Sequence, residues 1–366
     1  MTFKYPVYRP CLAGNEKKYV NECLDSTWIS SKGRFVDEFP KKFAAFLGVK
    51  NATGVCNGTV ALHLALTALG LGPGDEVIVP TFTYIASVNP ITQVGARPVF
   101  VDSLPETWQM SPKDFEKKIN PRTKAVMVVH LYGHPCDMDS IMETARRHDL
   151  IVIEDCAEAI GSLYKGRPAG SFGDIAAFSF FGNKTITCGE GGLVATNSDY
   201  LADKVVSLKG QGLARHREYW HDVLGFNYRM TNIQAALGLA QLERAEELIA
   251  AKINIAQWYQ ESIRALGLPV VFHGQKGEVR HSFWMNSILA RTREEREGIR
   301  GHLAAEGIET RPTFYPVHTM PIYSSKYQAL PVAEDIALRG INLPSYPDLT
   351  VNDVKYICKK ISEVYE

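Results

Sequence analysis

Between Glu76 and Asp155 the chain alternates short apolar segments with longer amphipathic ones. Helical patterns near residues 84–94, 111–119 and 137–148 separate four apolar segments: EVIVP, PVFVD, KAVMVVH and IVIED. Parallel strands need long crossover connections, which are usually helices, so this alternation indicates a mostly parallel sheet flanked by helices. We therefore predict an α/β fold in which ligands bind beyond the carboxyl ends of the strands.

Asp155 closes the most apolar of these segments and is expected to be buried. A buried carboxylate needs a partner. A metal held with Glu154 and Glu158 is one interpretation, but the further carboxylates that such an ion needs are not evident, and a cationic group such as a protonated pyridine nitrogen is simpler. His130 and His134 have the spacing of a metal pair, but the YGHP sequence disfavours the helix that would align them, so we expect no metal.

Residues 175–192 combine a buried-strand pattern with a lysine. The apolar run from Ile175 to Phe181 breaks at Gly182, presents Lys184, and leads into the glycine-rich turn GEGG. Aromatic and small neighbours solvate an ammonium poorly, so the pKa of this amine is expected to fall and the amine becomes a nucleophile for a carbonyl carbon. Such a lysine can hold an aldehyde cofactor as a Schiff base. The alternative is a solvated lysine on a hairpin turn.

A second candidate site lies at the start of a helical pattern after Val55. Gly58 and Thr59 precede the segment VALHLALTALGL, and Asn57 or Thr59 can cap that helix. Backbone N–H groups, the helix dipole and a threonine hydroxyl attract an anion at such a start, so we predict a phosphate site there. Most capped helices bind no phosphate, and an ordinary cap is the alternative.

The rest of the chain predicts a second, smaller domain. A long basic and aromatic loop over residues 210–230 precedes a helical region from Thr231 towards Leu266, and strand and helix patterns follow. Loops of this length are often functional. We predict a large domain over residues 1–245 and a small α+β domain over residues 246–366, entered through the long helix.

The charge balance gives no argument for nucleic acid or an anionic membrane as the main partner, although a local basic pocket is compatible with it. Lysine plus arginine equals aspartate plus glutamate at 40 each, and no apolar run is long enough to span a bilayer. The seven cysteines are scattered without a C-x-x-C pair, which favours reduced thiols over disulfides or zinc. The first residues lack the apolar core of a signal peptide, so we expect a cytoplasmic protein.

Five motifs occur together in a specific order: N-G-T before a helix, T-F-T-Y after a strand, E-D-C-A-E at a strand end, S-F-F-G-N-K-x-x-x-x-G-E-G-G, and G-F-N-Y-R-M. In order and spacing they resemble the DegT/DnrJ/EryC1/StrS sugar aminotransferases, a branch of the aspartate aminotransferase (fold type I) enzymes. The resemblance extends from Pro6 to the last helix. It implies a mostly parallel central sheet, pyridoxal 5′-phosphate as the cofactor, and a homodimer with shared active sites.

The resemblance also implies a role for each motif residue. Lys184 would bind the cofactor aldehyde and later move protons, and Asp155 would keep the pyridine nitrogen protonated. The remaining cofactor contacts would be Tyr84 and Ala157 on the two ring faces, Gly58, Thr59 and Ser179 at the phosphate, and Asn227 of the partner subunit. Glu158 stands where many relatives place Gln or His, so its role is left open.

The segments STWISSKG, HLYGHPCDMD and ETRPTFYPVHTMP resemble most closely the members that act on GDP-linked sugars. This implies that L-glutamate donates its amino group and that the C4 ketone of GDP-4-keto-6-deoxymannose receives it, as a step in lipopolysaccharide O-antigen synthesis. The sugar nucleotide contacts would be Trp28, Ser30, Arg311, Tyr315, His318 and the partner subunit's Arg229. A surface ion pair is the alternative for Arg311.

Other functions are compatible with the same motifs. One alternative is an aminotransferase for another nucleotide-linked ketosugar, with dTDP or UDP and the ketone at C3 or C4. Another is a regulatory protein that binds the cofactor without turnover, against which the intact Lys184 and Asp155 speak. Related sugar 3-dehydratases place histidine at the lysine position, so Lys184 argues against that activity.

Overall fold

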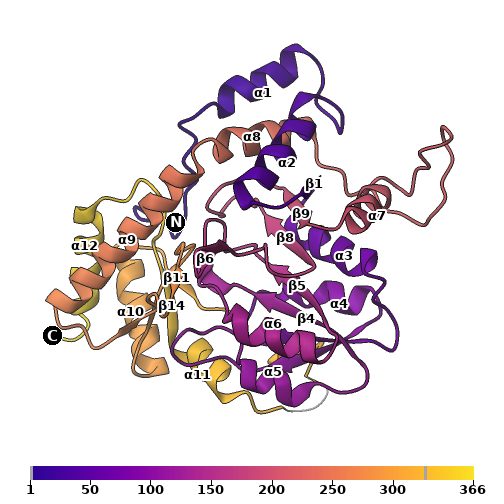
Figure 1. The fold of residues 1–366 in the computed structure, drawn as a ribbon. Coiled ribbons are helices and arrows are strands. Elements are labelled where there is room, and N and C mark those ends of the chain that lie inside the picture. The colour runs from indigo at the N-terminus through magenta and orange to yellow at the C-terminus, as the bar shows by residue number, and fades with distance from the viewer. Residues whose placement is uncertain (1–2, 325–327) are drawn as a thin grey trace.

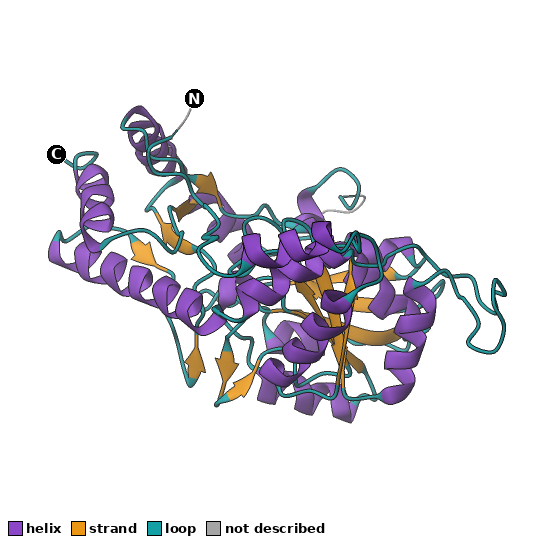
Figure 2. Ribbon diagram, turned by 90° about the horizontal axis from the view of Figure 1, so that it is seen from above, coloured by secondary structure: helices purple, strands orange, loops and turns teal. Residues whose placement is uncertain are grey.

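The computed structural model describes residues 3–324 and 328–366. Its centre is a seven-stranded sheet with the order β1-β9-β8-β5-β4-β2-β3, with helices packed around it (Figures 1 and 2). The strands from β8 through β5, β4 and β2 to β3 run parallel, whereas β9 is antiparallel to both its neighbours. The strands are β1 (Asn51–Val55), β2 (Glu76–Pro80), β3 (Arg97–Val101), β4 (Thr123–Val129), β5 (Ile151–Asp155), β8 (Ile175–Ser179) and β9 (Gly192–Thr196). The predicted mostly parallel α/β sheet is confirmed.

The crossover connections contain α3 (Gly58–Ala68), α4 (Asn89–Gln93), α5 (Pro112–Lys118), α6 (Met138–Arg147) and α7 (Asp199–Lys209). Where a single helix is predicted near residues 84–94, the structure has a 3₁₀ turn, η1 (Ile85–Ser87), followed by the short α4. Pro90 accounts for the difference, because a residue without an N–H fits only in the first turn of a helix.

Alternation along the strands explains why the sheet is buried on both faces. Successive side chains of a strand point to opposite faces. In β2, Val77 and Val79 belong to the core cluster that contains α3, whereas Ile78 belongs to the cluster that contains α5 and α6. All three are fully buried. A parallel sheet covered on both faces therefore has almost continuously apolar strands, as the sequence shows.

A helical layer covers the β8 and β9 part of the sheet (upper part of Figure 1). It consists of α1 (Glu16–Asp25), α2 (Arg34–Leu47) and α8 (Asn232–Leu242). Phe43 of α2 lies edge-on to Phe178 of β8 at 4.8 Å between ring centroids, and Phe39 lies 5.2 Å from Phe180. These contacts fix the strand end that leads to Lys184.

The last part of the chain forms a second sheet with the order β10-β12-β14-β13. Its elements are α9 (Ala245–Ala265), β10 (Val271–Phe272), β12 (Asn286–Leu289), α10 (Arg293–Ala305), β13 (Arg311–Pro312), η3 (Val317–Thr319), α11 (Pro331–Arg339), β14 (Gly340–Leu343) and α12 (Val351–Ser362). The single helical region predicted from Thr231 is two helices, α8 and α9, because Arg244 leaves helical geometry at φ −112° and ψ 12°. We propose residue 245 as the domain boundary because α9 begins there.

Two further connections join the large and small parts. Tyr5 of the amino-terminal arm pairs with Ile308, and the Val7 N–H donates to Glu309 Oε2 at 2.8 Å. A three-stranded sheet combines β11 (Val279–Arg280) of the small part with β6 (Leu163–Tyr164) and β7 (Arg167–Pro168) of the large part. Among the described residues, no helix has both the length and the apolar character needed to cross a membrane.

Candidate active site

A cavity of about 590 Å³ opens at the carboxyl ends of the central strands, within the size range of small-molecule sites. Tyr84 follows β2, Asp155 ends β5 and Ser179 ends β8, so three strands deliver a lining residue to it. The lining includes Asn57, Gly58, Thr59, Tyr84, Asp155, Ala157, Glu158, Ser179, Asn183, Lys184, Trp284, Arg311 and Phe314. The structure thus brings together all the predicted cofactor residues except Asn227.

Lys184 points into the cavity from the turn after β8. Its backbone N–H donates to the Phe181 carbonyl at 2.9 Å, and the Lys184 carbonyl accepts the Tyr8 hydroxyl. The Lys184 side chain is 12% exposed, and its Nζ lies 3.7 Å from Glu158 Oε1. Burial lowers the pKa of this amine, and the carboxylates of Glu158 and Asp155 oppose that shift only in part. The alternative of a solvated lysine on a hairpin is therefore not what the structure shows.

Asp155 is a buried carboxylate with two hydrogen-bond donors. The Ser87 hydroxyl donates to Oδ2 at 2.7 Å, and the Ala157 N–H donates to Oδ1 at 3.0 Å. Burial raises the pKa of the carboxyl group despite these bonds. A cation placed beside it in the cavity would offset the cost of burying its charge.

Glu158 lies behind Lys184 and is also buried. Its Oε2 accepts the Tyr132 N–H at 2.8 Å. Burial raises the pKa of Glu158 to about 7, although the ammonium of Lys184 and the Tyr132 N–H act in the opposite direction.

The start of α3 forms another wall of the cavity. Asn57 caps the helix, because its Oδ1 accepts the Val60 N–H at 3.0 Å. A side chain at Gly58 would place a Cβ only 2.6 Å from the Cβ of Ser179, so glycine is needed for this close approach of the helix to β8. Thr59 and Ser179 add hydroxyl groups beside the free N–H groups of the first turn.

This set of groups fits pyridoxal phosphate. A buried carboxylate suits a protonated ring nitrogen, a buried amine of lowered pKa suits an aldehyde, and a helix start with hydroxyls suits a phosphate. Asn183 Oδ1 is also buried in the lining and has no hydrogen-bond partner among the described residues. Asp155 would hold the ring nitrogen, Lys184 the aldehyde carbon, and the start of α3 with Ser179 the phosphate.

Four predicted residues lie outside the lining of the cavity. Asn227 and Arg229 belong to the 210–230 loop, where Arg229 Nε donates to Asn227 Oδ1 at 3.1 Å. Trp28 and Ser30 lie in the α1–α2 connection. Asn232, which follows the loop in sequence, binds this connection: its side chain donates to the Trp28 carbonyl at 2.7 Å and its N–H to the Ser30 carbonyl at 2.5 Å. Their roles stay predictions.

The three predicted residues of the 310–318 segment do not all lie at the cavity. Arg311 lines the cavity, and its guanidinium lies 3.3 Å from Glu309 Oε1. Tyr315 is half exposed and is not part of the lining. His318 is buried, with Nδ1 hydrogen-bonded to Thr81 Oγ1 at 2.7 Å and Nε2 to Glu334 Oε1 at 3.2 Å. The structure therefore does not bring His318 to this cavity, because both ring nitrogens are committed elsewhere.

Sequence reasoning missed two aromatic lining residues, Trp284 and Phe314. Trp284 lies in the segment FWMNSILA, which predicts only a strand, and it reaches the cavity because the small domain packs over the ends of the large-domain strands. The Trp284 indole N–H donates to the Asn183 carbonyl at 2.7 Å. The sequence shows only an aromatic residue beside a strand pattern, and that pattern does not distinguish a core residue from a residue that lines a binding site.

The metal interpretations find no support among the described residues. His130, Glu154 and Cys156 are the one group near Asp155 whose donor atoms lie close together. Glu154, however, is hydrogen-bonded to His130 Nε2 at 3.0 Å and to three backbone N–H groups. Neither predicted set, Asp155 with Glu154 and Glu158 or His130 with His134, is such a group. The carboxylate of Glu154 is satisfied without an ion.

Comparisons with known proteins agree with this site. The model of the DegT/DnrJ/EryC1/StrS aminotransferase family matches residues 10–362. GDP-perosamine synthase of Escherichia coli O157:H7 is 63% identical over 98% of this chain and 98% of its own length. GDP-perosamine synthase of Vibrio cholerae is 51% identical over 98% of this chain and 99% of its own length.

Solved structures are similar over the whole chain. DesV of S. venezuelae superposes with a TM-score of 0.90 at 35% identity, covering 96% of this chain and 94% of its own. The sugar aminotransferase Spr1654 of Streptococcus pneumoniae, solved in a PLP form, superposes with a TM-score of 0.92 at 29% identity, covering 100% and 98%. With its fold, its cavity and its intact lysine and aspartate, this chain belongs to the DegT/DnrJ/EryC1/StrS family of pyridoxal-phosphate-dependent aminotransferases.

Proposed function

We propose that this enzyme transfers the amino group of L-glutamate to C4 of GDP-4-keto-6-deoxymannose and so makes GDP-perosamine and 2-oxoglutarate. The observation that carries this proposal is the 63% identity, over 98% of both chains, with a GDP-perosamine synthase. The presence of Lys184 and Asp155 in the cavity supports it, because turnover needs the amine of the first and the carboxylate of the second. A role in O-antigen synthesis follows from the product and stays a prediction.

The chemistry follows from where these side chains lie. Pyridoxal phosphate supplies an electron-withdrawing ring that stabilises negative charge on the carbon beside the transferred nitrogen. Asp155 holds a proton at the ring nitrogen, and its burial strengthens that interaction. Lys184 Nζ moves a proton between the two reacting carbons, a task that suits an amine of lowered pKa. Trp284 and Phe314 exclude water from the same space.

Arg311 is our candidate for binding the diphosphate of the sugar nucleotide. Its guanidinium lines the cavity, and Glu309 orients one edge of it while accepting the Val7 N–H. The other edge keeps N–H donors that suit phosphate oxygens bidentately. Arg311→Ala should raise the KM for the sugar nucleotide with little change in the KM for glutamate, and Arg311→Lys should restore part of the charge but not the bidentate geometry. An unchanged sugar nucleotide KM would remove Arg311 from the site.

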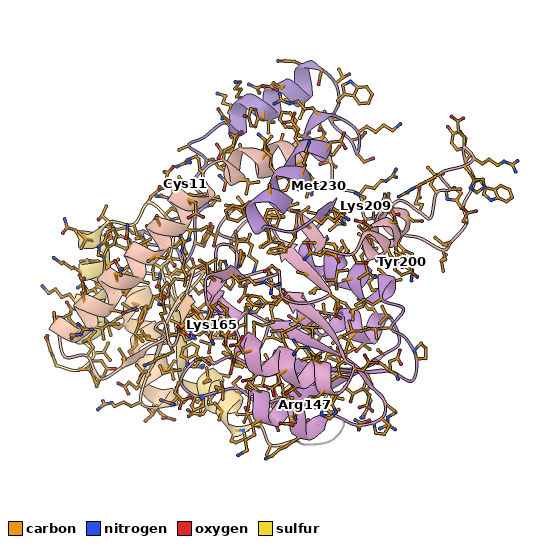
Figure 3. All side chains as sticks on the ribbon, in the orientation of Figure 1. Cys11, Arg147, Lys165, Tyr200, Lys209 and Met230 are labelled. Atoms are coloured by element: carbon orange, nitrogen blue, oxygen red, sulfur yellow. The ribbon has the colours of Figure 1, made fainter. Side chains whose placement is uncertain are left out.

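We propose a homodimer in which residues 210–230 of one subunit reach the cavity of the other. This loop extends away from its own subunit, with Tyr219 93% and Leu224 91% exposed. Lys209 and Met230 mark its two ends in Figure 3. Leu213, Trp220 and Val223 of the same loop are also exposed, and a concentration of exposed apolar side chains often marks an interaction site. Trp28 and Ser30 are tied to Asn232 at the base of the loop, so we include them in the same shared region.

Mass spectrometry tests the reaction. Purified protein, pyridoxal phosphate, ¹⁵N-labelled glutamate and GDP-4-keto-6-deoxymannose should give a GDP-linked amino sugar that carries the label. The Lys184→Ala variant should give none. Ketosugars linked to dTDP and UDP serve as matched substrates. If one of them is aminated and the GDP ketone is not, the family activity stands and the sugar assignment is wrong.

Hybrid dimers test the shared site. Lys184→Ala and Arg229→Ala are each expected to be impaired alone. If Arg229 acts in the partner's cavity, a hybrid of the two variants has one site with both defects and one site with neither, so co-expression restores activity. If Arg229 serves its own subunit, every hybrid site carries one defect and no activity returns.

The cysteine side chains bear on where the enzyme works. All seven are free, and five of them, Cys23, Cys136, Cys156, Cys188 and Cys358, are buried. Unpaired thiols are typical of reducing compartments. We propose a cytoplasmic location, which cell fractionation with an antibody to the protein tests.

A further inference from the structure

Trp284 closes one side of the cavity from the small domain. It precedes β12 and is 4% exposed. Its indole N–H donates at 2.7 Å to the carbonyl of Asn183, the residue directly before Lys184. The rings of Tyr132 and Phe314 pack around it at centroid distances of 6.0 and 6.5 Å. The indole plane therefore has one defined orientation relative to the turn that carries Lys184.

The ammonium of Lys184 rests between this ring and a carboxylate. Lys184 Nζ lies 3.9 Å from the centroid of the Trp284 ring and 3.7 Å from Glu158 Oε1. The other Glu158 oxygen accepts the Tyr132 N–H, which fixes the carboxylate in place. An aromatic face and a carboxylate both attract an ammonium much more strongly than a neutral amine. The two groups thus favour the protonated form and oppose the effect of burial, which favours the neutral amine.

We propose that Trp284 and Glu158 form a holding site for Lys184 when it is not bonded to the cofactor and its amine carries a proton. An amine that carries an extra proton has no free lone pair and cannot attack a carbonyl carbon. While Lys184 is held in this form, it cannot act as a nucleophile until its proton has been passed on. The inference rests on the cofactor role of Lys184 and not on which sugar is aminated. Trp284 acts here as a positioning residue.

The proton of the ammonium can be shared between Lys184 and Glu158. When it passes from Lys184 Nζ to Glu158 Oε1, the ammonium becomes an amine, the carboxylate becomes a carboxyl group, and the total charge is unchanged. Two other titratable groups face the pair, Asp155 from β5 and Tyr132 from the turn after β4, and His130 acts on Asp155. All three remain in the variants below. Burial favours the amine and the holding site favours the ammonium, so removing either holding group should lower the pKa of Lys184.

Trace acetylation of the cofactor-free protein tests this directly. Acetic anhydride reacts only with the neutral amine, so its rate of reaction with Lys184 from about pH 6 to about pH 10, read by mass spectrometry of the peptide, gives the titration midpoint. Glu158→Gln should lower the midpoint by about one pH unit or more, and Trp284→Leu by about one unit or less. Trp284→Phe should lie between Trp284→Leu and the parent, because it keeps an aromatic face but loses the bond to Asn183.

Two controls separate the holding role from a general loosening of the structure. Trp258→Phe removes a tryptophan from α9 and should leave the midpoint of Lys184 unchanged. Lys252 is fully buried against Ser345, so its acetylation in the same samples reports whether the domains have loosened. Unchanged Lys184 midpoints in folded Trp284→Leu and Trp284→Phe would overturn the role of Trp284. A shift that appears only together with faster Lys252 acetylation would also overturn it.

Discussion

Glu154 and Asp155 are neighbours on β5, both buried, and they point to opposite faces of the sheet. Glu154 faces the protein interior, where it accepts hydrogen bonds from His130 Nε2 and from the backbone N–H groups of Gly170, Phe172 and Gly173. Asp155 faces the cavity, and within the described part of the chain its donors are Ser87 and Ala157. One carboxylate is fully satisfied by the fold, and the other is left for a ligand.

The pKa shifts of the two groups express this difference. Burial alone would raise the pKa of Glu154, but the hydrogen bonds from His130 and the backbone outweigh it, and its pKa lies below the ordinary value of 4.5. At Asp155 burial prevails, and its pKa lies above the ordinary value of 3.8. At the cavity the fold therefore contains a carboxyl group whose charged form is disfavoured by burial. A cationic ligand beside Asp155 would stabilise that charged form.

The largest effect on stability is expected for Glu154→Ala. The substitution leaves several buried N–H groups without an acceptor, so the free energy of unfolding should fall by about 3–5 kcal/mol. Asp155→Ala is the matched control on the same strand and should lose less than half of that in cofactor-free protein. Urea unfolding followed by circular dichroism measures both. Equal losses would contradict the distinction between a satisfied and an unsatisfied carboxylate.

The pH dependence of these stability differences should have opposite signs. A carboxyl group with a lowered folded-state pKa stabilises the fold above its unfolded pKa, and this stabilisation is lost as the pH falls. The deficit of Glu154→Ala should therefore shrink below about pH 4.5. A raised folded-state pKa has the reverse effect, so cofactor-free Asp155→Ala should gain stability relative to the parent as the pH rises above about 4. Parallel curves for the two variants would contradict the assigned directions.

Glu154 should matter more than Asp155 for stability, but Asp155 should matter more for activity, which the Asp155→Asn variant tests. An asparagine cannot stabilise a positive charge at the ring nitrogen, so kcat should fall by about 10²–10³-fold. The loaded variant should also release its cofactor more readily on dialysis, which the absorbance of the cofactor reports. A variant with full activity would remove Asp155 from its role at the ring nitrogen.

Gly58→Ala should have an intermediate effect on both properties. The added Cβ would lie 2.6 Å from the Cβ of Ser179, and crowding of this kind costs about 1–3 kcal/mol. The start of α3 must also move away from β8, so the affinity for pyridoxal phosphate should fall. Gly48→Ala is not a suitable control, because Gly48 has φ +73°; Gly301→Ala, in open space on α10, is suitable. If Gly58→Ala changed neither the stability nor the affinity for the cofactor, the close approach of α3 to β8 would not be needed.

The smallest effect on stability is expected for Asn57→Ala, at the residue directly before Gly58. The Asn57 side chain is already used as the helix cap, so its loss should cost about 1 kcal/mol of stability. Asn57→Ser, which can also cap, should restore most of it. Thermal unfolding of the cofactor-free protein measures this loss. If the affinity for the cofactor falls more than the stability, Asn57 serves the ligand as well as the helix.

Local patterns predicted much of the site. Asp155, Ser179 and Lys184 follow strands whose apolar character is clear from the sequence, and parallel strands of one sheet place their carboxyl ends on one edge. The start of α3 was predicted from Asn57 and Gly58 for the same reason, because helix caps are local. The residues at the strand ends meet in one cavity because β5 and β8 are neighbours in the sheet.

Contacts between distant segments were beyond such patterns. Trp284 is about one hundred residues from Lys184 in the chain, and only the packing of the small domain over the sheet edge places its ring on the amine. His318 was expected at the substrate because of its neighbours, yet Thr81 and Glu334 occupy both of its ring nitrogens. Which polar groups are already satisfied depends on the tertiary structure.

The sequence by itself therefore determined the sheet, the helix that starts at the cavity, and the identity of the lysine and the aspartate, because periodicity, caps and strand ends are properties of consecutive residues. The tertiary structure alone decided which buried carboxylate is free to meet a ligand and which is not. Glu154 and Asp155 are adjacent and chemically alike. Donors from remote segments satisfy the first and leave the second open, and that difference in hydrogen bonding separates a structural charge from a functional one.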